Sequence, residues 1–229
     1  MQPLALLLVF LAGSLVVTSA DAGLFDRLNP FSSFETRCEA LPPARFEVVA
    51  APIAFVEDFS QSLSALSSMN DAPRFRRTVG LMQARIAYES TLESKGLEDR
   101  PGGRVCSRPS VRLVFSATPM TVFVAREFAD DRCRRTMILE HEMRHVAVYR
   151  ESLNELVERA RRELTAAYGD QVLYANDARE SQETMRQRLQ AFMRKFMQAR
   201  YAEIKARHAE IDTSEEYTRL GQACVTSPG

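Results

Sequence analysis

Two histidines stand one helical turn apart in the segment His141-Glu142-Met143-Arg144-His145, and the whole chain contains only three histidines. On a helix, residues i and i+4 share a face, so both imidazoles can bind one metal ion, and imidazole nitrogen suits zinc. A carboxylate between them, Glu142, can act as general base for a water that the metal activates. The spacing therefore predicts a zinc site at His141 and His145, with Glu142 as the catalytic residue.

The residues around this motif predict a long helix. Apolar side chains recur every three or four residues from 132 to 168, and Asp130-Asp131 supplies an N-cap. A second helix is expected to begin after Asn176 or Asp177 and to run to about 211. Because the connection between them is short, the two helices are expected to pack as an antiparallel hairpin over residues 131–212.

A catalytic zinc ion usually has three protein ligands and one open position, so a third ligand is needed. Glu151 holds the place of the third ligand in the longer HExxHxxGxxH pattern, but on an unbroken helix it lies roughly 120° around the axis from the second motif histidine. We expect Glu151 on a solvated helix face. In the hairpin register, position 208 lies opposite position 138, within one turn of the motif, and His208 is on the apolar stripe of the second helix. His208 is therefore the predicted third ligand; Asp212, one turn further on, is expected to orient an imidazole or to replace His208 as ligand.

The segment before the helices, residues 44–128, carries the signals of a small sheet. Period-two alternation, helical spacing and turn residues divide it into five predicted parts: strand 45–52, helix 55–69, strand 80–90, loop 94–109, and a hairpin of 111–115 with 121–128 around Ala117-Thr118-Pro119-Met120. The fold expected is α+β: a small, mostly antiparallel sheet packed with helices, followed by the long helical hairpin that carries the motif on its first helix. A short polar tail at 213–229 completes the chain, and Tyr217 is expected to pack it.

The start of the chain predicts export. Leu4 to Val17 is an apolar run of signal-peptide length, and Ala20-Asp21-Ala22 is an A-x-A cleavage site. We expect residues 1–22 to be a cleaved signal peptide and residues 23–229 to be a single domain that is secreted or periplasmic; an uncleaved anchor is the alternative. The chain carries 30 basic and 30 acidic residues, a balance that gives no electrostatic basis for binding nucleic acid or an anionic membrane.

The four cysteines suit an oxidising compartment, where an even number predicts two disulfides. The hairpin register returns the end of the second helix to the start of the first, so Cys224 in the following tail is expected to pair with Cys133. Cys38 and Cys106 then form the other pair and join the N-terminal lead-in to the loop before the predicted hairpin.

On the strength of His141-Glu142-x-x-His145, the chain resembles the zincin metallopeptidases, and in the order of its parts it is similar to predicted secreted bacterial zinc proteases of unassigned substrate. The resemblance implies a zinc-dependent peptidase that acts on a peptide or protein substrate. It also implies that an edge strand near the motif receives an extended peptide, for which Thr121–Phe128, the last strand before the motif, is the candidate. Two other functions fit the same residues: a zinc hydrolase or amidase acting on cell-wall material, and a non-catalytic exported protein that binds a protein partner through its long helical hairpin.

Overall fold

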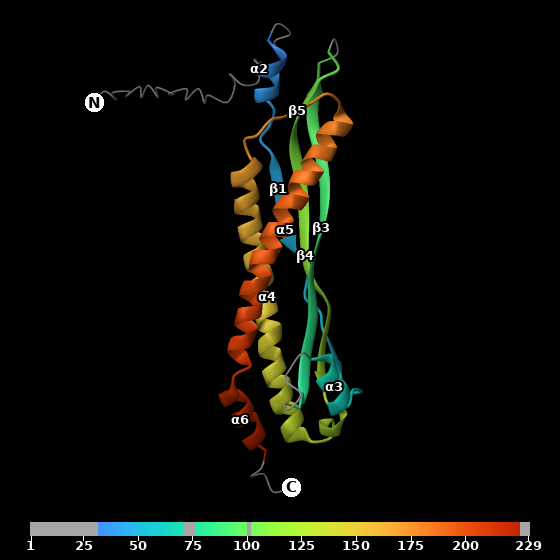
Figure 1. The fold of residues 1–229 in the computed structure, drawn as a ribbon, viewed down its shortest axis with the longest axis vertical. Helices are drawn as coiled ribbons and strands as arrows, with labels where there is room; N and C mark the ends of the chain where they lie inside the picture. The colour runs from blue at the N-terminus through green and yellow to red at the C-terminus, as the bar shows by residue number, and fades with distance from the viewer. Residues whose placement is uncertain (1–31, 71–76, 100–101, 225–229) are drawn as a thin grey trace, which may run out of the picture.

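The computed structural model describes residues 32–70, 77–99 and 102–224, so the predicted signal peptide at residues 1–22 lies outside the described residues. The described residues form a long rod made of two layers, a sheet and a pair of long helices that lie along it (Figure 1). The α+β class predicted from the sequence is confirmed. No helix within the described ranges is both long and apolar enough to cross a membrane.

Strand β4 (Val105–Val124) is the centre of the sheet. Strand β3 (Gly80–Glu98) runs antiparallel along one side of β4 for its whole length. On the other side, β1 (Arg45–Ala50) and β2 (Val56–Asp58) pair in parallel with successive parts of β4, and the short β5 (Leu173–Ala175) pairs antiparallel with its first residues. The sheet is therefore mixed, its longest pairing is antiparallel, and β3 is an edge strand among the described residues.

The predicted hairpin of 111–115 with 121–128 is wrong, because most of both runs belongs to the single strand β4. Its buried residues fall on odd positions from Val111 to Ala117 and on the even positions 120, 122 and 124 after that, with Phe123 buried as well. Between these two stretches, Thr118-Pro119 stands opposite the single residue Arg85 of β3. Such a bulge shifts the alternation by one residue and tolerates proline, which cannot donate to a strand ladder. Pro119 therefore marks a bulge within a strand and not a turn between two strands.

Two further parts of the sheet region differ from the prediction. The predicted helix at 55–69 is instead strand β2 followed by α3 (Leu63–Met69), which begins after the N-cap Ser62. The predicted loop at 94–109 is largely strand, because β3 continues to Glu98 and β4 begins at Val105. That end of β3 exposes most of its side chains, which explains why its polar residues are typical of a loop.

The long helices begin and end where the sequence predicts. Helix α4 spans Arg132–Tyr168 with Asp131 as its N-cap, and α5 spans Ala178–Ile211 with Asp177 as its N-cap. Each N-cap carboxylate accepts a hydrogen bond from the backbone amide three residues on, which satisfies a donor that the first turn leaves unpaired. The apolar faces of both helices and of β4 meet in one core, whose large buried side chains include Leu113, Phe115, Leu153, Leu156, Leu164 and Met193.

The two long helices cross and do not lie side by side over their whole length. The connection between them contains β5, which pairs with the start of β4, so α5 begins over the sheet. It first meets α4 at the C-terminal end of that helix, where Phe192 packs against Tyr168, and then crosses it toward the opposite end of the rod (Figure 1). This crossing changes the register, and His208 lies beside His145 and not opposite position 138. The tail, for which the sequence predicts no helix, forms α6 (Ser214–Gln222) next to the first turns of α4.

Each end of the rod has a disulfide, and the two pairs are those expected from the sequence. Cys38–Cys106 joins α2 (Phe34–Glu39) to β4 at the end of the rod that we call the α2 end. Cys133–Cys224 joins the first turn of α4 to the residues after α6 at the opposite end, which we call the α6 end (Figure 1). The tail is therefore tied covalently to the helix that carries the motif.

Candidate metal centre

Helix α4 brings the two motif histidines together at the α6 end of the rod. His141 and His145 lie on the buried face of α4 with 4% and 7% of their surfaces exposed, and their ring centroids are 5.1 Å apart. The helix is continuous through the motif, so both side chains leave the same face on successive turns. The sequence prediction of a paired-histidine site on this helix agrees with that placement.

Asp212 supplies the third ligand atom of the group. It caps the C-terminus of α5, and its Oδ1 atom is 3.2 Å from His141 Nε2 and 3.3 Å from His145 Nε2. Ligands of a tetrahedral zinc ion at about 2.0–2.1 Å from the metal stand about 3.3–3.4 Å from one another. The two histidine–aspartate separations therefore match those of a zinc site, and the ligand atoms of all three residues lie within 4.8 Å of one another.

His208, the predicted third ligand, lies behind His145 and outside this group. The Nδ1 atoms of the two rings are 2.9 Å apart, so one ring donates a proton and the other accepts it. Burial, together with the charge of His145, lowers the pKa of His208 to about 4, which keeps this ring neutral and able to accept. When Nε2 of His145 faces a metal, its Nδ1–H donates to His208. This geometry places Asp212, the alternative ligand of the sequence prediction, in the group that could hold a metal ion, and it places His208 where it can orient the ring of His145.

Helix α6 covers the other side of the group. Glu216 Oε1 lies 3.2 Å from His141 Nδ1, and the same carboxylate pairs with Arg144. Tyr217 donates a hydrogen bond of 2.9 Å to Asp212 Oδ1, and its ring centroid is 5.9 Å from that of His141. A carboxylate at the second ring nitrogen fixes the tautomer and the orientation of a metal-binding imidazole. Arg144 lies 2.8 Å from the same His141 Nδ1, so an ion pair of Glu216 and Arg144 contacts the second ring nitrogen of His141 where His145 has His208.

The protonation states of the group follow from its close packing. Burial opposes the ionisation of Asp212, but hydrogen bonds from His141, His145 and Tyr217 outweigh burial and hold the pKa of this carboxyl far below its usual range. Burial also lowers the pKa of His141, but the surrounding carboxylates, Asp212 foremost, outweigh that effect and raise the pKa above its ordinary value. Asp212 thus stays ionised near neutral pH, as a metal ligand must.

Glu142 lies beside the group and is buried against strand β3, with 5% of its surface exposed. Burial raises the pKa of its carboxyl, and the charges of His141 and His145 offset part of that rise. The carboxylate accepts a backbone hydrogen bond from Met82, and a methyl group at Gly80 would come within 2.6 Å of Glu142 Oε1. Gly80 is therefore a position where the lack of a side chain lets the strand approach α4.

The strand predicted to receive a substrate is not at an edge of the sheet. The first half of the segment Thr121–Phe128 lies in β4, which pairs there with β2 on one side and with β3 on the other. The strand that borders the motif is β3, and two α4 side chains bind its backbone: Glu142 accepts from Met82, and Tyr149 donates to the carbonyl oxygen of Ala84. The part of β3 beside the motif is therefore already engaged by α4.

Glu151 lies away from the group, as predicted. Its side chain is 64% exposed, and its carboxylate pairs with Arg207 at 2.6 Å. The sequence interpretation missed Glu216 and assigned Tyr217 only to packing. A signal for this part of the site is present, since His208, Asp212 and Glu216 recur at every fourth position. That spacing places residues along one side of a helical segment.

Comparison with known proteins assigns the chain to no family: no family model, no curated protein and no solved structure matches it. Within the described residues, His141, His145 and Asp212 form a group that can hold a metal ion.

Proposed function

We propose that this protein is an exported zinc-dependent peptidase in which His141, His145 and Asp212 hold the zinc ion and Glu142 acts as general base. The observation that carries the proposal is the position of Asp212 Oδ1, 3.2 and 3.3 Å from the two histidine Nε2 atoms. Two imidazoles and one carboxylate form a donor set that catalytic zinc sites use, and this set leaves a fourth position for water or substrate.

Each residue of the site has a distinct task in this proposal. His141, His145 and Asp212 would hold a zinc ion that would supply Lewis acidity, enough to lower the pKa of a water molecule and to polarise a substrate carbonyl. Glu142 takes the proton of that water and delivers it to the leaving group, and the rise in its pKa that burial causes makes it a stronger base than an exposed glutamate. Glu216 and His208 hold the motif rings by their Nδ1 atoms, so that both Nε2 atoms stay directed at one point.

The substrate and the compartment rest on separate arguments. Peptide bonds are proposed because of the zincin resemblance of the motif. The apolar leader and the two disulfides support export to a secreted or periplasmic location. A zinc amidase acting on cell-wall material uses the same residues on a different amide bond, so trials with both substrate classes separate the two activities.

Zinc content and cleavage test the proposal together. The purified mature protein is expected to contain about one zinc ion per chain, to lose it in His141→Ala and to keep it in Glu142→Gln. In the digest of a broad peptide library, Glu142→Gln is expected to cleave at least ~100-fold more slowly than wild type. Glu151→Gln, which alters an exposed glutamate on the same helix, is the matched control and is expected to cleave normally. A wild-type protein without zinc, or equal cleavage by wild type and Glu142→Gln, contradicts the proposal.

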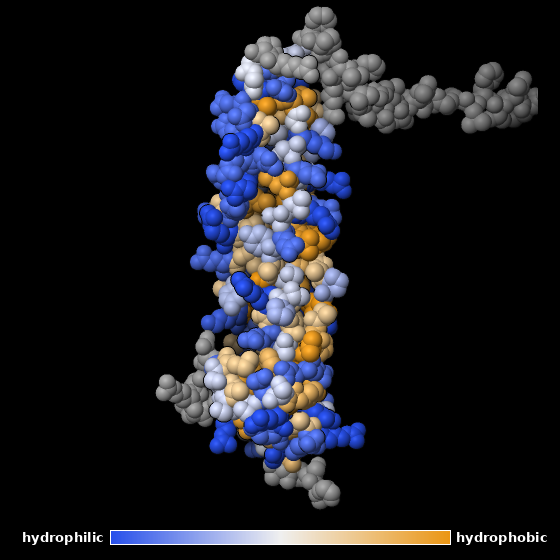
Figure 2. Space-filling model, turned by 90° about the vertical axis from the view of Figure 1, so that its right-hand side faces the viewer, coloured by the Kyte–Doolittle hydropathy of each residue, from blue (hydrophilic) through white to orange (hydrophobic). Residues whose placement is uncertain are grey.

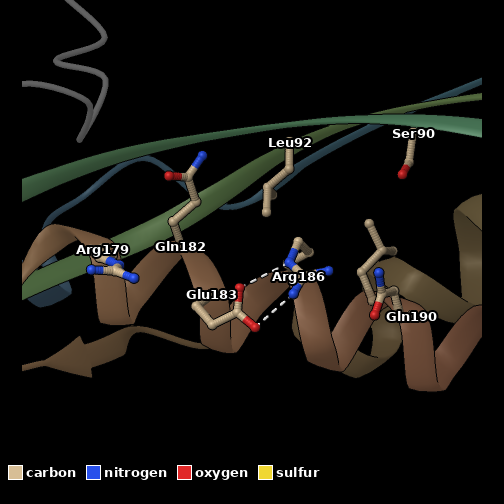
Figure 3. Close-up of a pocket in the computed structure, with 8 residues that line it drawn as sticks. Ser90, Leu92, Arg179, Gln182, Glu183, Arg186 and Gln190 are labelled. Atoms are coloured by element: carbon tan, nitrogen blue, oxygen red, sulfur yellow. Dashed lines mark hydrogen bonds and ion pairs between the residues drawn. The ribbon is translucent and has the colours of Figure 1, made fainter.

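A second function, binding of a protein partner without catalysis, is favoured by the burial of Glu142. A cleft of about 450 Å³ lies away from the metal centre, between α5 and β3 and nearer the α2 end. It is lined from the strand by Leu92 and from the helix by Arg179, Gln182, Arg186 and Gln190 (Figure 3). On the long face in Figure 2, hydrophobic residues lie among hydrophilic ones along the rod. A zinc-loaded protein that cleaves neither peptides nor cell-wall amides supports this second function.

A further inference from the structure

Helix α6 contributes to the metal centre but has little packing of its own. It contains no buried residue, and an isolated helix this short is marginal in water. Polar contacts hold it against both long helices: Glu216 binds His141 and Arg144 of α4, and Tyr217 binds Asp212 at the C-terminus of α5. The Arg144 side chain is 45% exposed, and ion pairs of exposed groups stabilise weakly. The strongest link between this helix and the motif is therefore covalent, the disulfide just beyond its C-terminus.

We propose that the Cys133–Cys224 disulfide assembles the metal site, so that the chain binds its metal ion tightly only after this bond has formed. The inference rests on the proposed function, since it concerns the regulation of the same site. Cys133 is in the first turn of the helix that carries the motif, and Cys224 follows α6. With the bond closed, Glu216 is confined beside His141 and Tyr217 beside Asp212, so that the ligand residues are held as one preassembled site.

The chemistry of assembly is a thiol–disulfide exchange. The thiols of Cys133 and Cys224 release two protons and two electrons as their S–S bond forms, and a disulfide of an oxidising partner protein is reduced to two thiols. A dithiol reductant reverses the exchange and frees α6, with Glu216 and Tyr217, from the motif and from Asp212. The consequence is that metal uptake follows export, because the bond persists in an oxidising compartment and not in a reducing one.

Exposure distinguishes this disulfide from the other one. Cys133 and Cys224 are both half-buried, whereas Cys38 and Cys106 are fully buried in an apolar cluster. Exchange requires access of the attacking thiolate to a sulfur atom, so a mild dithiol opens Cys133–Cys224 first. Cys38–Cys106 also lies at the other end of the rod, away from the metal centre (Figure 1). It therefore serves as the matched control.

Zinc affinity tests the inference, measured by competition with a chromophoric chelator. Replacement of both Cys133 and Cys224 by serine is expected to weaken zinc binding roughly 10- to 100-fold. Replacement of both Cys38 and Cys106 by serine is expected to leave zinc affinity at the wild-type level. As a second arm that needs no variant, wild-type protein is reduced mildly, its free thiols are alkylated and mapped by mass spectrometry, the reductant is removed, and the affinity is measured again. Circular dichroism reports whether each sample remains folded.

The outcomes separate this inference from the proposed function. Equal zinc affinity of oxidised and selectively reduced protein overturns the inference, and so does an equal loss in both serine variants, which would reflect general destabilisation. Oxidised wild type that binds no zinc overturns the inference and the proposed function together. Zinc binding that depends on Cys133–Cys224, in a protein that cleaves no peptide, supports the inference and removes only the peptidase.

Discussion

The two ends of the rod each carry a disulfide, but the surroundings of the two bonds differ. At the α2 end, Cys38 and Cys106 are fully buried beside Phe34, in a cluster where apolar packing and the covalent bond act together. At the α6 end, Cys133 and Cys224 are half-buried and tie a helix without buried residues to a group of ionisable side chains. One disulfide reinforces packing that already exists. The disulfide at the α6 end holds polar groups in place that apolar packing does not hold.

The two ends therefore have different roles: the α2 end contributes to the stability of the fold, and the α6 end carries the candidate functional site. Buried ionisable groups contribute little folding energy unless each is well paired, and removal of one partner leaves an uncompensated charge. At the α6 end, the negative charge of Asp212 adds to the burial that raises the pKa of Glu142. A cation held between the histidines and Asp212 relieves that repulsion. A metal ion bound there is therefore expected to stabilise the α6 end, whereas the described residues of the α2 end include no such ligand group.

The largest effect is expected on zinc affinity, when the carboxylate of Asp212 at the α6 end is removed. Asp212→Ala removes the carboxylate that lies 3.2 Å and 3.3 Å from the histidine nitrogens, and we expect stoichiometric zinc binding to be lost, with affinity lower by more than ~100-fold. Isothermal titration of metal-free protein measures this loss. Glu151→Ala is the matched control, because this acidic residue on α4 is exposed and pairs outside the site. Wild-type affinity in Asp212→Ala, together with its loss in His208→Ala, would contradict the ligand set argued from the structure.

The second effect is a loss of stability when the disulfide at the α2 end is removed. Serine at both Cys38 and Cys106 is expected to lower the free energy of unfolding by about 2–5 kcal/mol, because the bond closes a long loop and its sulfurs are buried. Denaturant unfolding of the two proteins measures the difference. The loss is expected to be the same with zinc present and with zinc removed. A loss that changes with zinc would show that the two ends are coupled and would weaken the comparison.

Sequence reasoning predicted those parts of the molecule whose signals are local. The bounds of α4 and α5 follow from helical periodicity and from the N-caps Asp131 and Asp177. The pairing of His141 with His145 follows from their spacing on one helix. These features depend on residues within a few turns of each other, so the chain alone carries enough information to find them.

The errors arise where distant segments meet. The hairpin prediction failed at Pro119 because a bulge opposite Arg85 lets one strand continue through the proline, and the bulge depends on β3. The predicted register of α5 against α4 was wrong because β5 holds the connection on the sheet. His208 therefore lies beside His145 and not opposite position 138. Helix α6 was missed because it is only 9 residues long and buries none of them, so it contains too few apolar repeats for periodicity to reveal it.

The smallest expected effect separates ligation from orientation at His208. His208→Ala removes the acceptor for the Nδ1–H of His145, and zinc affinity is expected to fall about 10-fold, as for other groups that orient a metal ligand. His208→Asn is expected to restore part of that loss, because its amide oxygen can accept the same hydrogen bond. With cobalt in place of zinc, the visible spectrum of His208→Ala is expected to match that of wild type, since the ligands are unchanged. A cobalt spectrum that changes in His208→Ala, with no recovery in His208→Asn, would make His208 a ligand and restore the sequence prediction.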